Sequence, residues 1–267
     1  MIEILQFDKL HCKNCYKCVR QCPIKAIEVK NHCAQIRPEE CILCGECTII
    51  CPQKTKDAVS EVAQLKEVLL NGKMVIASVA PSFFAYFNVS FQSLKSALAK
   101  LNFKDAFETA EGAYLVKSEY EKLIAQNPEQ VWISSCCSSV NLLVEKYYPE
   151  VLPHLAPVLT PIQAHAKLLK ERHPDALIAF ITPCISKKVE RYSLESQVDL
   201  VITFEELENM FQEAGVEMQE VLGEQERQFL SRRFPTDGGI ISTLARTEGC
   251  GYVSVSGYHA CVQAIRD

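Results

Sequence analysis

The chain has 267 residues, of which 48% are hydrophobic and 23% are charged, and it carries a formal net charge of −5. This composition is typical of a globular protein, and the negative balance argues against a broad nucleic-acid surface. No apolar run approaches the roughly 18 residues that a membrane-spanning helix needs, so we expect no membrane partner. The N-terminus shows no basic segment followed by an apolar one, which favours a cytoplasmic protein.

The cysteines are distributed unevenly. Nine of the 14 lie within the first 51 residues. The first 56 residues contain nine Lys/Arg and six Asp/Glu, a charge of +3, which leaves −8 for the remainder. C-x-x-C clusters in a chain without a secretion signal indicate metal binding by reduced thiols, as in the cytoplasm of an anaerobe. We therefore predict a metal-binding domain over 1–56, a connecting helix over 57–72 and a larger domain over 73–267.

Two cysteine runs in the first domain share one spacing, CKNCYKCVRQCP from residue 12 and CILCGECTIICP from residue 41. The pattern C-x2-C-x2-C-x3-C-P is that of two-cluster ferredoxins, in which the fourth cysteine of each run holds the other 4Fe-4S cluster. A zinc site needs only four thiolates, so this doubled pattern argues against zinc. Cys33 lies outside the pattern and is expected to be buried. The predicted ligand sets are Cys12, Cys15, Cys18 and Cys51 for one 4Fe-4S cluster, and Cys41, Cys44, Cys47 and Cys22 for the other.

Beyond residue 73, apolar strand-like segments alternate with helical ones. This order favours an α/β domain with a mostly parallel sheet, preceded by a small α+β ferredoxin-like domain. Thr203 and Glu206 have the spacing of a capping box at the start of the last helix. The predicted strands span 73–80, 131–135, 176–182, 199–204 and 252–257, and the predicted helices span 91–101, 113–126, 139–148, 161–172 and 204–215.

Two further cysteine motifs follow predicted strands. VWISSCCSSV places Cys136 and Cys137 between a strand and a helix, and ALIAFITPCISKKVE places Cys184 likewise. Sites in open α/β sheets gather at the carboxyl ends of strands, so both motifs can face one pocket, with Lys187 or Lys188 beside an anionic ligand. Taken singly, each of these residues also fits a buried structural thiol or a solvated lysine.

A two-cluster ferredoxin head followed by SSCCSSV and TPCISKKVE resembles the FeFe hydrogenases over nearly the whole chain. The resemblance implies that Cys137 and Cys184 are two of the four thiolates that hold the 4Fe-4S part of an H-cluster. It implies that Cys136 passes protons and that Lys187 hydrogen-bonds a cyanide of the two-iron subsite, with Glu190 completing the motif. The segment FETAEGAYLVKSEYEKL is similar to a family segment that contributes a proton-transfer glutamate, which makes Glu119 a candidate.

Several positions depart from the family's motifs. Ser138 replaces a proline, Thr182 a methionine and Ser242 a glutamate, changes that resemble the regulatory, sensor-like branch. The family's third motif, C-x3-C, does not follow Cys184. This leaves open whether the chain is part of a longer protein, with a C-terminal signalling domain, or a member that does not complete the H-cluster. The last cysteine, Cys261, is expected to be buried rather than a ligand.

Two functions remain open. The first is reversible H2 oxidation and proton reduction, or H2 sensing, with ferredoxin or another redox protein as electron partner. The second is a non-catalytic iron–sulfur protein that carries electrons or relays redox state, as in related eukaryotic proteins of iron–sulfur assembly.

Overall fold

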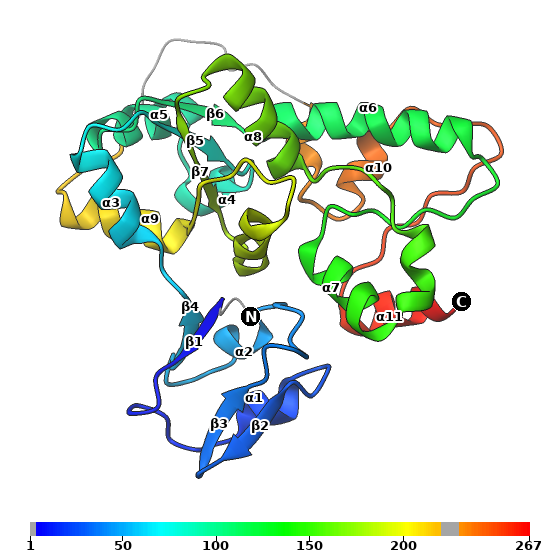
Figure 1. Cartoon of the computed structure of the whole chain (residues 1–267), viewed down its shortest axis with the longest axis horizontal. Helices are drawn as coiled ribbons and strands as arrows, with labels where there is room; N and C mark the ends of the chain where they lie inside the picture. The colour runs from blue at the N-terminus through cyan, green and yellow to red at the C-terminus, as the bar shows by residue number, and fades with distance from the viewer. Residues whose placement is uncertain (1–3, 220–229) are drawn as a thin grey trace.

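The computed structural model describes residues 4–219 and 230–267 (Figure 1). Residues 4–58 form a small unit, here called the head, in which β1 pairs with β4 and β2 with β3, both antiparallel. Each short helix of the head begins one residue before the third cysteine of a run. The head contains β1 (Leu5–Phe7), α1 (Lys17–Gln21), β2 (Ile27–Lys30), β3 (Cys33–Ile36), α2 (Glu46–Ile49) and β4 (Lys56–Ala58).

Residues 62–219 and 230–267 form the larger unit, here called the body. Its sheet has four parallel strands in the order β6–β5–β7–β8. Every residue of the central strand β5 is buried, as expected of a parallel strand with both faces covered. The strands are β5 (Val75–Val79), β6 (Asp105–Glu108), β7 (Leu177–Thr182) and β8 (Leu200–Thr203).

Helices cover the sheet and extend the body towards the head. Side chains of α3, α5, α8 and α9 form the main core together with the strands. The capping box of Thr203 and Glu206 is confirmed at the start of α9. The helices are α3 (Val62–Leu70), α4 (Phe83–Phe87), α5 (Phe91–Lys100), α6 (Ala110–Gln126), α7 (Ser138–Tyr147), η1 (Pro149–His154), α8 (Pro161–Arg172), η2 (Ile185–Tyr192), α9 (Phe204–Glu213), η3 (Leu230–Arg233), α10 (Gly239–Thr243) and α11 (Tyr258–Arg266). None of the helices in the described ranges is long and apolar enough to cross a membrane.

The parallel sheet with its helices, preceded by the small head, confirms the predicted fold class. Four assignments of secondary structure are wrong. Residues 252–257 form no strand, and 131–135 form only one bridge, between Ile133 and Leu155, because an apolar segment becomes a strand only where a backbone is free to pair with it. β6 was not predicted, because this edge strand begins and ends with acidic residues. The helix predicted from residue 57 begins at Val62, since residues 56–58 pair with β1.

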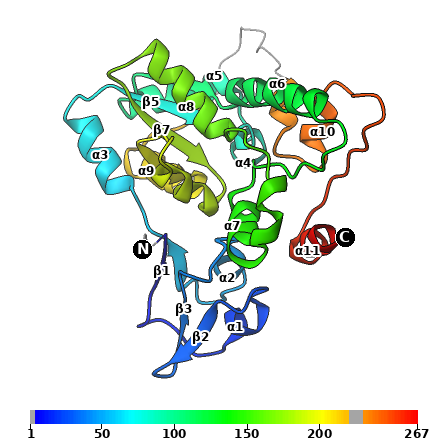
Figure 2. The ribbon, with the colours of Figure 1, turned by 45° about the vertical axis from the view of Figure 1, so that its right-hand side comes forward.

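The head and the body meet along α7 and α11, which lie close to the head in both views (Figures 1 and 2). Ile42 of the head forms one apolar cluster with Leu143 of α7 and Val262 of α11. Lys146 Nζ donates to the carbonyl of Cys41 (2.7 Å), and Tyr147 Oη donates to the carbonyl of Glu40 (2.7 Å). Both bonds hold the start of the second cysteine run against the body.

Candidate metal centres

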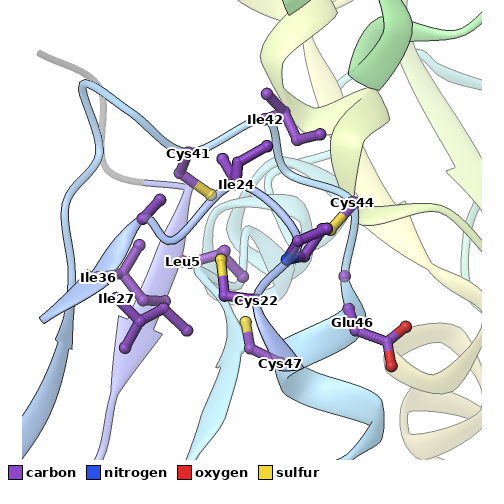
Figure 3. Close-up of a pocket in the computed structure, with 13 residues that line it drawn as sticks. Leu5, Cys22, Ile24, Ile27, Ile36, Cys41, Ile42, Cys44, Glu46 and Cys47 are labelled. Atoms are coloured by element: carbon purple, nitrogen blue, oxygen red, sulfur yellow. The ribbon is translucent and has the colours of Figure 1, made fainter. Parts of the chain in front are cut away.

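The eight cysteines of the two runs gather around two separate hollows in the head. Each hollow receives three cysteines from one run and the last cysteine of the other run. Figure 3 shows the hollow that contains Cys22, Cys41, Cys44 and Cys47, and the rest of its wall is mostly apolar. The structure brings together the two predicted sets of four; that they bind clusters stays a prediction. Cys22, Cys41, Cys44 and Cys47 line the inner hollow, and Cys12, Cys15, Cys18 and Cys51 line the outer hollow.

Three thiols of the inner hollow resist ionisation. Burial raises the pKa of Cys47 to about 12, and it also raises the pKa of Cys41 and Cys44. Neighbouring thiolates of the same set add repulsion at all three positions. Because metal ligation requires deprotonated cysteines, four thiolates in this apolar hollow need cations at its centre. The donor set and its surroundings therefore fit a 4Fe-4S cluster, whose irons supply that charge.

The outer hollow offers its cysteines more polar contacts. The backbone N–H of Thr55 donates to Cys51 Sγ (3.4 Å), and the Thr55 hydroxyl lies 3.3 Å from the same sulfur. Partial burial acts to raise the pKa of the Cys51 thiol, but hydrogen bonds from Thr55 and the charge of Lys56 lower the pKa overall. Hydrogen bonds to ligand sulfurs tune the potential of a cluster, so the two hollows would hold clusters with different surroundings.

Ile185 joins the inner hollow to the body. A Cβ built on Gly45, which lines this hollow, would lie 3.5 Å from Cδ1 of Ile185. Ile185 also packs against the apolar core of the head, which contains Cys22 and Cys47. Since Ile185 directly follows Cys184, the inner hollow adjoins the segment that carries the second cysteine motif of the body.

The two cysteine motifs of the body meet beyond the carboxyl end of the central strand β7. Cys137 is the N-cap of α7 and Cys184 is the N-cap of η2. Lys187 Nζ donates to the carbonyl of Cys136 (2.7 Å). Ser138 Oγ donates to Glu190 (2.5 Å). Each motif thus contributes one side chain that hydrogen-bonds the other motif, Lys187 from the second and Ser138 from the first.

Glu190 is the centre of this arrangement. Its buried carboxylate accepts hydrogen bonds from Lys187, from Ser138 and from Thr160 Oγ1 (2.5 Å), the N-cap of α8. Burial alone would lower the pKa of Lys187, but the charge of Glu190 and the hydrogen bond to it raise the pKa, so the side chain of Lys187 stays an ammonium. A buried ion pair is tolerated where its remaining atoms are hydrogen-bonded, as they are here. Ser138 supplies one of these donors.

Tyr120 is a member of the site that the sequence does not reveal. Its hydroxyl accepts the backbone N–H of Ser135 (2.9 Å) and lies 3.6 Å from Cys136 Sγ. Burial raises the pKa of the Cys136 thiol, while contacts with Ser134 and Tyr120 and the charge of Lys187 act to lower it. The helical pattern of α6 indicates that Tyr120 is buried, but which segment it touches depends on tertiary packing.

The thiols expected to bind metal in the body are accessible. Cys137 and Cys184 are both exposed, and Cys184 Sγ lies 3.1 Å from Ser186 Oγ. Cys261 and Cys33, which were expected to be buried, are only half-buried, a correction to both predictions. Burial and the nearby Cys137 thiol raise the pKa of Cys261, so α11 brings a third thiol into this region. That Cys137 and Cys184 bind metal stays a prediction; they would supply half of the four thiolates that a 4Fe-4S cluster takes.

Two predicted residues lie apart from this site. Glu119 is on the exposed face of α6, where its carboxylate accepts a hydrogen bond from Lys122 (2.8 Å). Its role in proton transfer stays a prediction. Lys188 is buried, donates to the carbonyl of Val201 (2.8 Å) and pairs with Glu206. Lys188 therefore connects η2 to β8 and α9, whereas Lys187 donates to the carbonyl of Cys136.

Family models match both parts of the chain. The model described as the C-terminal domain of the iron only hydrogenase large subunit matches residues 73–257, and a 4Fe-4S dicluster domain matches residues 4–52. Among solved structures, the apo FeFe-hydrogenase HydA1 of Chlamydomonas reinhardtii superposes with a TM-score of 0.52 at 23% identity, covering 64% of this chain and 52% of that one. This likeness concerns the fold.

Two curated relatives differ in the function that their names state. The cytosolic Fe-S cluster assembly factor NAR1 of Kluyveromyces lactis is 25% identical over 207 residues, which cover 70% of this chain and 44% of the relative. The periplasmic Fe hydrogenase large subunit of Nitratidesulfovibrio vulgaris is 28% identical over 252 residues, covering 81% of this chain and 59% of the relative. The chain spans about half the length of these curated relatives.

Proposed function

Because the chain belongs to the family of iron-only hydrogenase large subunits, we propose that it is a redox protein whose head exchanges electrons with the cysteine site of the body. The inner and the outer hollow would each hold one 4Fe-4S cluster on four cysteines. When bound, such clusters supply reversible one-electron transfer at potentials that their surroundings set.

The packing of Ile185 against the core of the head, next to Gly45, carries this proposal. It makes the inner hollow the neighbour of Cys184, while Lys146 and Tyr147 hold the second cysteine run against α7. If the head exchanged no electrons with the body, the inner hollow would not need to lie next to Cys184. The arrangement supports a path from the outer hollow, through the inner hollow, to the site in the body.

In the body, we assign Cys137 and Cys184 as ligands of an H-cluster-type site that oxidises or produces H2, or senses it. Cys136 holds a proton on its sulfur, because burial keeps its pKa high, and a thiol held in this way can deliver the proton to a neighbouring base. Glu190 fixes the ammonium of Lys187 beside Cys136. Tyr120 limits the orientations open to the sulfur.

A non-catalytic electron relay is the second candidate. It is favoured by the position of Lys187, whose ammonium is bound to Glu190 and to the carbonyl of Cys136 within the protein. The match to an iron–sulfur assembly factor supports the same function. In this case the head would pass electrons to or from a partner, and the body would present the exposed Cys137 and Cys184 without a two-iron subsite.

Iron and sulfide analysis with infrared spectroscopy of protein maturated under anaerobic conditions separates these functions. Both require two clusters in the head, about eight irons per chain. Bands of CO and CN⁻ would establish the hydrogenase-type site. Two reducible clusters without those bands would establish the relay. A chain that binds no cluster in the head would contradict both functions.

A further inference from the structure

The outer hollow lies in the most basic part of the molecule. The segments that form its wall and rim, residues 8–20 and 51–57, contain six Lys or Arg and two Asp, an excess of four positive charges. The first 56 residues as a whole carry only +3 and the remainder carries −8. The positive charge of the head is therefore concentrated around one of its two hollows.

Four of these lysines are directed to solvent. Lys9, Lys13, Lys17 and Lys54 are all exposed, and within the described part of the chain no carboxylate forms an ion pair with them. Asp8, which directly precedes Lys9, is bound to His11 Nδ1 (2.5 Å). A group of unpaired like charges is unfavourable in the isolated protein and becomes favourable against a surface of opposite charge.

An apolar side chain stands among the lysines. Leu10 is 92% exposed. Its backbone N–H donates to Asp8 Oδ1 (2.9 Å), and the N–H of Asp8 donates to the carbonyl of Thr55 (2.8 Å), which lines the outer hollow. Leu10 is thus held in a fixed loop beside the cysteines. An apolar contact surrounded by charged residues is the usual anatomy of a protein-binding surface.

The cysteines beneath this surface are accessible. Cys15 is exposed and Cys12 is half-buried, whereas Cys18 at the back of the outer hollow is buried. A redox centre in a docked protein could therefore approach the outer hollow from the side of Cys15. The exposed lysines and the accessible end of the hollow belong to the same part of the head.

We propose that Lys9, Leu10, Lys13, Lys17 and Lys54, here called the rim, form the docking surface for an acidic one-electron carrier protein. The inference rests on the proposed function, because it gives the outer hollow a partner for electron exchange. One electron would pass from the reduced carrier, which is oxidised, to a cluster held by the cysteines of the outer hollow, which is reduced, and no bond would form or break. The lysines steer the encounter, and Leu10 provides the apolar contact.

Binding of an acidic two-cluster ferredoxin to the cluster-loaded full chain tests the rim. In the first variant, Lys9→Glu, Lys13→Glu and Lys54→Glu are combined. The matched control combines Lys73→Glu, Lys104→Glu and Lys167→Glu, three exposed lysines of the body with the same total change of charge. We expect the Kd at low ionic strength to rise at least about tenfold in the rim variant and less than about twofold in the control, with wild-type binding weakened by salt.

A second variant, Leu10→Ser, should weaken binding several-fold at every salt concentration. Equal binding by the rim variant and its control, or binding of the wild type that salt does not weaken, would overturn the proposal. The wild type could also self-associate, with the rim variant alone abolishing this self-association and leaving ferredoxin binding unchanged. That result would identify a second copy of the chain as the occupant of the rim, and it would overturn the proposal too. Iron analysis keeps the proposals apart: a chain without clusters contradicts the proposed function, whereas a loaded chain without rim-dependent binding contradicts the docking surface alone.

Discussion

The hydroxyl of Tyr120 lies 3.6 Å from the sulfur of Cys136, so a phenol from the middle of α6 contacts the thiol that precedes α7. The same hydroxyl accepts the backbone N–H of Ser135, which leaves its own proton available for a neighbour. A phenol that donates to a sulfur stabilises the thiolate more than the thiol. Tyr120 therefore works against burial, which acts to raise the pKa of Cys136.

Replacing Tyr120 by phenylalanine should make Cys136 less reactive. Loss of one hydrogen bond, on the order of 1 kcal/mol, would raise the already elevated pKa of this thiol further, so roughly fivefold less thiolate would be present at a given pH. We expect the rate of alkylation of Cys136 by iodoacetamide, followed by peptide mass spectrometry, to fall by this factor near neutral pH. Its pH dependence should move to higher pH. The exposed Cys184 serves as internal control, and a rate at Cys136 equal to the wild type would argue against the hydrogen bond.

The substitution Glu190→Gln should destabilise the body strongly. It leaves the buried ammonium of Lys187 without its counter-charge, a loss of about 3 kcal/mol or more. The single tryptophan, Trp132, packs in the apolar cluster of Tyr120, so its fluorescence reports unfolding of this region in urea. The matched control is Glu119→Gln on the exposed face of α6, where the ion pair with Lys122 contributes less than about 1 kcal/mol. Equal urea midpoints for the two variants would show that Glu190 is not the centre of the site.

The sequence predicts the contacts of residues whose partners are close along the chain. It does not predict contacts that arise from the packing of distant segments. The crossing of Cys22 and Cys51 between the hollows follows from the ligand spacing, because three cysteines of a run fill one loop and the fourth lies beyond a helical turn. The capping box of Thr203 is a local pattern as well. The contact of Tyr120 with Cys136 brings a helix face to a loop, and no local pattern specifies that loop.

The strand predicted at residues 252–257 also depends on packing that the sequence does not show. Residues 252–257 alternate as a strand should, but pairing also needs a free backbone edge, and the sequence of a segment does not show whether one is present. Ser138 is a third case. Its difference from the family's proline could be seen in the sequence, whereas its hydrogen bond to Glu190 requires η2 to lie beside α7.

The junction between head and body should loosen when Lys146 is replaced by methionine. The change removes the donor to the carbonyls of Cys41 (2.7 Å) and Pro38 (3.2 Å) while keeping most of the side-chain volume. We expect faster amide hydrogen exchange across residues 39–44, because segments with fewer contacts to the body open more often. The control Lys167→Met alters an exposed lysine of α8 and should leave these amides unchanged. An unchanged exchange pattern in the Lys146 variant would show that the apolar cluster around Ile42 and the hydrogen bond from Tyr147 to Glu40 hold the junction without Lys146.

Single-cysteine variants of the head should each lose a different cluster. Cys22→Ala removes a donor from the inner hollow and Cys51→Ala removes one from the outer hollow, so each variant should retain about four of the eight irons. Electron paramagnetic resonance of the reduced proteins should show two different remaining signals, because Thr55 hydrogen-bonds a sulfur of the outer hollow only. Cys33→Ala, which alters a cysteine outside both hollows, should keep all eight irons. Wild-type iron and sulfide contents in both ligand variants, or the same remaining signal in both, would contradict the exchange of cysteines between the two runs.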